Sequence, residues 1–352
     1  MNAENSTTEK GAQAIVGGMF GLPELQWING RVPGFLDDAS LMLANASCGL
    51  WLLARELNPG RIWMPSYLCE SMVTAIHAAG REIQFYEVGY DLHIPNGDWL
   101  ERIRPEISWC LSIISDSPWT KRWQPGQEPM VLVSSQTRQA LLSDNAARDS
   151  DFLLFSPRKF LGVPDGGLLR CNSKVISRVR LNQAPVAWTM KVLEASVLRR
   201  EFDRHGGSRR WFDLRRQADS EQPIGAYAMS QLTENLLRFG FDYEEISRKR
   251  IENYGRLLED LREFALFSSM PAGVVPLGFP IRVAHRDRVR QELFDHAIYP
   301  PIHWPIDNIV PPQFSESHRL AAEILTLPCD QRYSRADMAR IASITRHAGT
   351  GS

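Results

Sequence analysis

The chain has 352 residues, which is long enough for two domains or for one large α/β unit. Its 40 basic and 41 acidic side chains nearly cancel, so no net charge attracts nucleic acid or an anionic membrane. The sequence contains no apolar run long enough to span a bilayer and does not begin like a signal peptide, so we expect no membrane partner.

The first two-thirds of the chain alternates helical patterns with short β-branched or aromatic runs. We expect the polar lead, residues 1–13, to be mobile. Asn45 or Ser47 can cap a first helix, and Gly80 can end a second. Six segments read as strands: 61–65, 82–88, 109–114, 130–134, 151–156 and 166–171. This order predicts an α/β fold with a mainly parallel sheet sandwiched by helices.

From about residue 173 the pattern becomes mainly helical. A charged amphipathic helix is expected from Tyr243 to Phe264, and a pair of strands over residues 273–284. Further helices are expected near these residues: 286–297, 315–325 and 335–346. The composition shifts at 240–245, which predicts a large domain over 1–242 and a smaller C-terminal α+β domain over 243–352.

Three loops lie where strands meet helices, and open α/β sheets bind ligands at the carboxyl ends of their strands. Small residues at 46–49 open a helix, where backbone N–H groups can approach a phosphate. The second loop spans 65–69, and the third, 156–159, ends in Lys159. The aromatic residues flanking Lys159 should partly desolvate it, which favours the free amine that a Schiff base needs. The alternative is a surface lysine whose stem packs on those rings.

The five cysteines are dispersed, without the close spacing of a zinc site or a disulfide framework. An odd number of scattered cysteines is typical of a reducing compartment, so we expect a cytoplasmic protein with free thiols and no metal.

Together these segments resemble the DegT–DnrJ–StrS type of PLP-dependent sugar aminotransferases, fold type I, over nearly the whole chain. Residues 45–88 resemble the helix, strand and loop that shape the cofactor pocket of that family. "DFLLFSPRKFLGVPDGGLL" (151–169) resembles the segment that carries the Schiff-base lysine, and its Pro-Asp-Gly-Gly turn is the most specific part. Residues 228–261 resemble the helices leading into the small domain, and 325–341 its closing strand and helix.

The resemblance implies roles for particular residues. Lys159 would bind pyridoxal 5'-phosphate (PLP) and move a proton between the substrate α-carbon and C4′ of the cofactor. Ser156 and the backbone of Ser47 and Cys48 would hold the phosphate. Cys69 takes the position of the aromatic residue that stacks on the pyridine ring.

Two further residues are weaker candidates for contact with substrate. Tyr67 precedes the stacking position by two residues, and His303 lies where the small domain of the family approaches the site.

One position departs from the family pattern. An acidic residue normally pairs with the pyridine nitrogen in the family. The segment "VLVSSQTRQALLS" (131–143) places Gln136 there, with Gln139 aligned to the end of the pattern, and a shift of one residue would place Ser135 there. Neither Gln136 nor Ser135 is acidic. A charge-assisted hydrogen bond contributes roughly 1.5–3 kcal/mol against about 1 kcal/mol for a neutral one. If most of that difference fell on the transition state, the rate would fall about tenfold or more.

The sequence therefore favours a PLP-dependent aminotransferase that uses a small amino donor, glutamate or glutamine, and a carbonyl acceptor. The acceptor would be a keto-sugar nucleotide or a secondary-metabolite carbonyl. Gln136 keeps two alternatives open: a PLP enzyme of non-transaminase chemistry, or an impaired homologue with a binding or scaffold role. The resemblance also implies a homodimer, with Trp188, Trp211 and Phe212 as expected interface residues.

Overall fold

The computed structural model describes most of the chain, and the predicted lead, residues 1–13, lies outside the described ranges. These are 14–24, 36, 40–57, 61–92, 108–112, 131–135, 152–171, 176–270 and 274–350.

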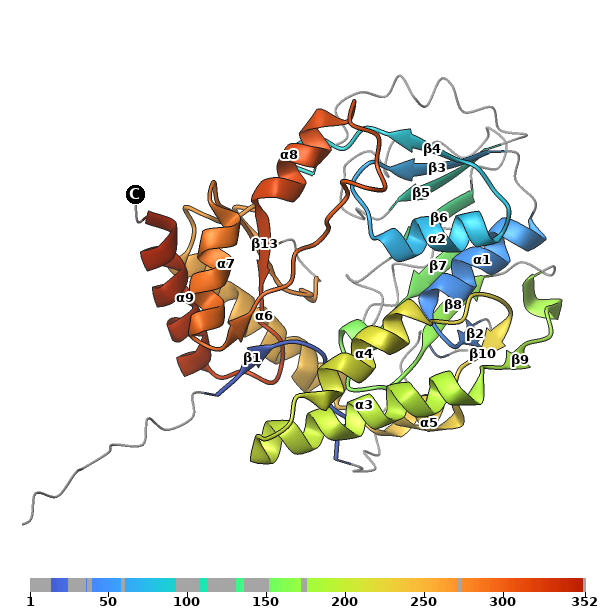
Figure 1. Cartoon of the computed structure of the whole chain (residues 1–352), viewed down its shortest axis with the longest axis horizontal. Helices are drawn as coiled ribbons and strands as arrows, with labels where there is room; N and C mark the ends of the chain where they lie inside the picture. Colours follow the sequence, from blue (N-terminus) through green and yellow to red (C-terminus); the bar gives the residue numbers. More distant parts are fainter. Residues whose placement is uncertain are drawn as a thin grey trace, which may run out of the picture.

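The large sheet has nine strands among the described residues, in the order β4-β3-β5-β6-β7-β8-β2-β10-β9 (Figure 1). Its strands are β2 (Ser40–Leu43), β3 (Arg61–Pro65), β4 (Ile83–Tyr86), β5 (Ser108–Ser112), β6 (Val131–Ser135), β7 (Phe152–Phe155), β8 (Gly167–Cys171), β9 (Asn182–Gln183) and β10 (Tyr227–Ala228). The run from β4 to β7 is parallel, whereas β8 pairs antiparallel with both β7 and β2. The predicted α/β fold with a mainly parallel sheet is confirmed.

The helices of the first part are α1 (Ala46–Glu56), α2 (Glu70–Ala78), α3 (Val186–His205), α4 (Arg210–Ser220) and α5 (Gln231–Phe239). Figure 1 shows α1 and α2 side by side across the sheet, and α1 contacts β7 and β8. Gly49 makes this close packing possible, because a Cβ atom there would lie 2.4 Å from Cδ1 of Leu154. The N-terminus of α1 is thereby fixed beside the end of β7.

The C-terminal part contains α6 (Tyr243–Asp260), β11 (Phe279–Arg282), α7 (Arg286–Asp295), β12 (Ile298–Tyr299), α8 (Ser315–Glu323), β13 (Ile324–Leu327) and α9 (Arg335–Thr350). Strand β11 pairs antiparallel with β13, and β12 pairs in parallel with β1 (Val16–Gly17). The expected strand pair over 273–284 is wrong, since 274–278 is not a strand. Pro276 and Gly278 interrupt that run, and β11 finds its partner in the later strand β13 instead.

Three buried clusters lie under these elements. The first joins the large sheet to α1 and α2, the second joins α6, α7 and α9 to β11 and β13, and the third packs β7, β8 and the turn that carries Lys159 against α5. Helix α6 begins at Tyr243, the predicted start of the second domain. Three residues of that predicted domain nevertheless pack in the cluster of the large sheet: Ile306, Val310 and Leu320. The division into 1–242 and 243–352 stays a prediction.

The three aromatic residues that were expected at a subunit interface differ in how much of their surface is exposed. Trp188 and Trp211 are 7% and 3% exposed, so the expectation that they lie on the surface is wrong, whereas Phe212 is 45% exposed. The Trp188 indole instead donates a hydrogen bond to the Ala218 carbonyl, 2.9 Å away inside the α3–α4 pair. The described thiols of Cys48, Cys69 and Cys329 are free. None of the described helices combines the length and apolarity needed to cross a membrane.

Candidate active site

Lys159 lies on a short 3-10 helix, η4 (Pro157–Lys159), directly after the carboxyl end of β7. Pro157 opens this turn with a preset backbone angle, and the Lys159 N–H donates to the Ser156 carbonyl at 3.1 Å. The neighbouring rings of Phe155 and Phe160 are buried, while Lys159 itself is half-buried. The lysine therefore stands on a fixed turn between the core and a cavity.

The Pro-Asp-Gly-Gly turn that follows holds this segment against two helices. A Cβ atom at Gly167 would lie 2.3 Å from the Asn45 carbonyl carbon, so only glycine lets the turn dock on the start of α1. The Gly166 N–H donates to the Ala44 carbonyl at 2.7 Å. Asp165 is buried and accepts two hydrogen bonds from Ser230, from its N–H at 2.8 Å and its hydroxyl at 2.7 Å, which ties the turn to α5.

The start of α1 presents Ser47, and not Cys48, to the cavity. The Asn45 side chain caps the helix by accepting from the Cys48 N–H at 3.0 Å. The Cys48 thiol is buried and donates to the Pro223 carbonyl at 3.3 Å, and burial raises the pKa of this thiol. The Ser47 hydroxyl reaches the Ser71 carbonyl at 3.4 Å. The predicted phosphate contact of Cys48 would therefore have to use an N–H group that the cap already occupies.

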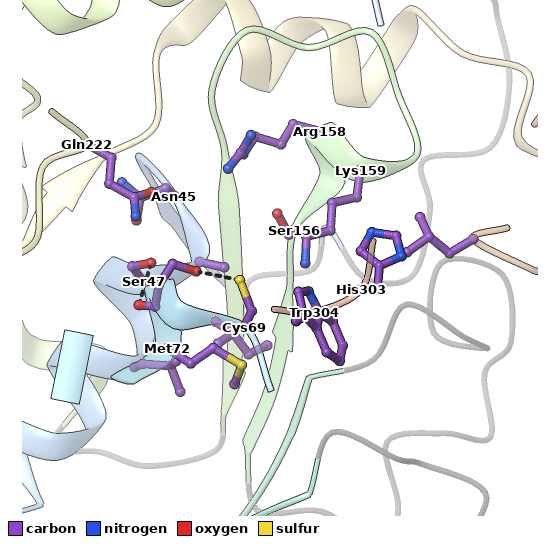
Figure 2. A pocket seen from close by; sticks show the side chains of 15 residues that line it. Asn45, Ser47, Cys69, Met72, Ser156, Arg158, Lys159, Gln222, His303 and Trp304 are labelled. Atoms are coloured by element: carbon purple, nitrogen blue, oxygen red, sulfur yellow. Dashed lines mark hydrogen bonds between the residues drawn. The ribbon is translucent and has the colours of Figure 1, made fainter. Parts of the chain in front are cut away.

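The cavity has a volume of about 150 Å³ and gathers residues from distant parts of the chain. Five predicted site residues line it: Ser47, Cys69, Ser156, Lys159 and His303. Figure 2 shows Ser156 and Lys159 on the same side as His303 and Trp304, with Ser47 and Cys69 opposite. Cys48 and Tyr67 do not line it, and Gln136 and Gln139 lie outside the described residues.

Cys69 and Trp304 line two facing walls of the cavity. The Cys69 sulfur lies 3.2 Å from the Ser71 hydroxyl oxygen at the start of α2. Tyr67 is 2% exposed and packs behind Trp304, with ring centroids 5.4 Å apart. Burial raises the pKa of the Tyr67 hydroxyl. Tyr67 therefore supports the wall, and Trp304 is the aromatic ring that faces the cavity.

His303 is held in one orientation beside Lys159. Its Nδ1 atom lies 3.0 Å from the Thr326 hydroxyl oxygen on β13. Burial, together with the positive charge of Lys159, lowers the pKa of His303 to about 4. The imidazole is therefore neutral at neutral pH and can donate or accept a hydrogen bond in the cavity.

The lining residues that were not predicted as site residues include Arg158, Gln222 and Trp304. Arg158 and Lys159 are adjacent, so the lysine motif already signalled a second cation, but nothing in the sequence connects Gln222 to the turn. Figure 2 shows Arg158 extending toward the side of the cavity that holds Asn45 and Gln222.

Arg158 gives the cavity its second positive charge. Its guanidinium lies 3.4 Å from Asp219, a carboxylate that Arg215 already binds at 2.6 Å. No carboxylate occurs among the described residues that line the cavity, and no three metal-binding side chains cluster in the described parts of the chain. The arrangement therefore suits an anionic ligand that also carries a group reactive toward an amine.

No family model matches the chain, and no curated protein matches it. Several solved structures are similar to the chain. A protein from Streptococcus pneumoniae designated a sugar aminotransferase shares 14% identity, covers 94% of this chain and 97% of its own, and gives a TM-score of 0.63. The Helicobacter pylori aminotransferase PseC, involved in pseudoaminic acid biosynthesis, shares 13% identity over 92% and 93% of the two chains, with a TM-score of 0.60.

A third similar structure is the aminotransferase TlmJ from Streptoalloteichus hindustanus. It shares 18% identity, covers 88% of this chain and 85% of its own, and gives a TM-score of 0.57. These identities are low, and the coverage is nearly complete on both sides. The chain has the fold of the sugar aminotransferases.

Proposed function

We propose that the protein is a PLP-dependent aminotransferase that uses Lys159 as its Schiff-base amine and transfers an amino group to a keto-sugar nucleotide or a secondary-metabolite carbonyl. The observation that carries the proposal is the position of Lys159. Its turn follows the carboxyl end of β7, and its side chain lines a cavity beside hydroxyl groups and a second cation. The Streptococcus pneumoniae protein of the same fold was solved in PLP and PMP forms.

The residues of the cavity fit two groups of PLP, its aldehyde and its phosphate. The amine of Lys159 suits the aldehyde, while Arg158 and the hydroxyls of Ser47 and Ser156 suit the phosphate. Cys69 and Trp304 supply the walls between which an aromatic ring could lie. When bound, PLP supplies an electron sink for the electrons of the substrate α-carbon.

Each side chain then has a task of its own. Lys159 would hold the cofactor covalently and, once displaced by the amino donor, would carry a proton at Nζ to and from the substrate α-carbon. The neutral His303 beside it would hydrogen-bond to the substrate, since its Nδ1 is already held near Thr326. Trp304 would keep water from that side of the cavity.

The test is an absorbance spectrum of the purified protein with PLP, recorded before and after borohydride, for the wild type and for Lys159→Ala. We expect a band that depends on Lys159 and is lost on reduction. Adding glutamate or glutamine should then convert the band to that of PMP. Absence of a lysine-dependent band would overturn the proposal.

A second candidate function follows from Gln136, which lies outside the described residues. A neutral partner for the ring nitrogen favours PLP chemistry that needs less electron withdrawal than transamination, or an impaired homologue that binds PLP without turnover. A lysine-dependent band that no amino donor changes would support this candidate. Gln136→Asp distinguishes the two alternatives, because it should raise transamination if protonation of the ring nitrogen limits the rate.

We also propose that the protein acts as a homodimer in the cytoplasm. Two apolar side chains one turn apart on α3 support a subunit contact, Val186 at 71% and Met190 at 57% exposure, together with Phe212 on α4. Light scattering of Val186→Glu beside the wild type tests the contact, since a charge there should shift the mass toward the monomer. The free thiols are typical of a reducing compartment.

A further inference from the structure

Arg250 is a buried cation behind the candidate active site. It lies on α6, is fully buried, and makes no hydrogen bond to a carboxylate of the described residues. Its guanidinium instead donates to the side-chain oxygen of Gln331 at 2.6 Å and to the carbonyls of Pro276 at 2.8 Å and Leu277 at 3.2 Å. A buried guanidinium held this way requires its acceptors to stay in place.

The remaining hydrogen bond of Arg250 reaches the lysine turn. The Phe160 carbonyl, one residue after Lys159, accepts from Arg250 at 3.2 Å and from the Gln331 amide at 2.8 Å. The guanidinium also lies over the Phe160 ring, 4.5 Å from its centroid. Two side chains from distant parts of the sequence thus converge on the peptide that follows Lys159.

The directions of the Arg250 N–H groups explain these contacts better than the positive charge alone. A planar guanidinium offers five N–H donors in fixed directions, so it can hold three chain segments at once. Here the segments are the lysine turn, residues 276–277 and the loop after β13 that carries Gln331. Leu277 lines the cavity, so the same cation also holds part of its wall. Movement of the lysine turn would break the hydrogen bonds that the Phe160 carbonyl accepts from Arg250 and Gln331.

We propose that Arg250 and Gln331 are positioning residues that fix the direction of the Lys159 amine through the Phe160 carbonyl. This proposal rests on the proposed role of Lys159. Neither side chain lines the cavity or touches a reacting atom. They act through the backbone of the turn, and they connect the position of the nucleophile to α6 and to the loop after β13.

Gln331→Glu removes the hydrogen bond to Phe160 and converts the bond with Arg250 into an ion pair. The carboxylate keeps an oxygen that accepts from Arg250 but loses the N–H group that donates to the carbonyl. Arg250→Lys removes the planar donor set while keeping the positive charge. Asn253→Ala is the matched control. Asn253 lies on the same helix, is buried, and donates to the carbonyls of Asp330 and Tyr333 at 3.1 Å each, without contact to the lysine turn.

The first measurement is PLP binding by absorbance titration over a range of pH, with melting temperature recorded in parallel. Loss of one hydrogen bond at the turn should weaken PLP binding of Gln331→Glu about fivefold or more and move the pH midpoint of its absorbance band. Asn253→Ala should lower the melting temperature and leave both properties unchanged. The proposal is wrong if Asn253→Ala loses as much PLP affinity per degree of lowered melting temperature as Gln331→Glu does.

The second measurement needs no PLP. Acetylation of the full-length protein by acetic anhydride, followed by peptide mass spectrometry, gives the rate at Lys159 relative to the exposed Lys249. We expect this ratio to change in Gln331→Glu and Arg250→Lys but not in Asn253→Ala. An unchanged ratio overturns the positioning role. A changed ratio in a protein that binds no PLP would instead retain the positioning role and reject the proposed function.

Discussion

Two parts of the cavity wall, the lysine turn and the pair His303 and Trp304, are built by different kinds of contact. At the lysine turn the backbone itself is packed, since Gly167 lies against the Asn45 backbone and the Gly166 N–H donates to Ala44. His303 and Trp304 are held by side chains instead. His303 is held by the Thr326 hydroxyl, and Trp304 leans on the Tyr67 ring.

This difference has a consequence for which substitutions each part of the wall can tolerate. Backbone packing leaves no room for substitution and suits a group that never changes, such as the cofactor of the proposed function. Side-chain contacts can be exchanged without moving the fold, which suits the part of a site that selects a substrate. Changes in the backbone of the lysine turn should therefore affect folding, and changes around His303 should affect titration and binding.

Gly167→Ala is expected to have the largest effect. Its new Cβ atom would lie 2.3 Å from a backbone carbon of Asn45, and neither backbone can move without shifting α1 or β8. We expect the free energy of unfolding to fall by about 3 kcal/mol or more, measured by urea denaturation. A loss of only a few tenths of a kcal/mol would show that the turn does not fix α1.

The pH dependence of stability should report on His303. Its pKa in the folded protein is about 4, below the ordinary 6.5, so the unfolded chain takes up a proton first as the pH falls. Stability is then full above about pH 6.5 and decreases toward pH 4, by at most about 3 kcal/mol. His303→Gln should flatten this part of the stability–pH curve.

The same histidine reports on Lys159. Since the lysine charge contributes to the low pKa of His303, Lys159→Met should raise that pKa, which a proton NMR titration of the imidazole can follow. An unchanged pKa in that variant would mean that burial alone sets it.

Arg158→Gln should weaken the binding of PLP without a comparable effect on pyridoxal. Loss of a charge-assisted hydrogen bond, roughly 1.5–3 kcal/mol, corresponds to about a tenfold to hundredfold weaker PLP affinity. Pyridoxal lacks the phosphate and serves as the matched ligand. Equal losses for both compounds would contradict a phosphate contact, and Arg158→Lys should recover part of the affinity.

The smallest expected effect is a gain in the free energy of unfolding. Gly255 lies inside α6 with no atom within 4 Å of an added Cβ, so Gly255→Ala should stabilise the protein by up to about 1 kcal/mol. The same urea measurement gives the sign. A loss at Gly255 comparable to the loss at Gly167 would remove the argument that close backbone packing distinguishes the lysine turn.

The sequence displays the lysine turn better than the surroundings of His303. Strand β7, the turn and the glycines are contiguous, so local patterns could predict that Ser156 and Lys159 follow a strand, as they follow β7 in the structure. Arg158 was visible in the same motif, but its direction depends on the 3-10 turn, which no periodicity reveals.

The positions of His303 and Trp304 depend on contacts between residues far apart in the sequence. Thr326 on β13 holds His303, and Tyr67 packs behind Trp304 although the two are separated by more than half of the chain. Short strands such as β9 and β10 have no sequence period of their own, and β11 pairs with β13 only after the chain folds back. Such pairings are set by tertiary packing, which a single sequence does not display.

The most direct test of the central claim is the attachment site of PLP. The protein is incubated with PLP, reduced with borohydride and digested, and the peptide that contains "FSPRKFLG" is sequenced by mass spectrometry. We predict that Lys159 carries the mass of the reduced cofactor in the wild type and that Lys159→Ala carries it nowhere. Modification spread over several surface lysines, with Lys159 unmodified, would contradict the account.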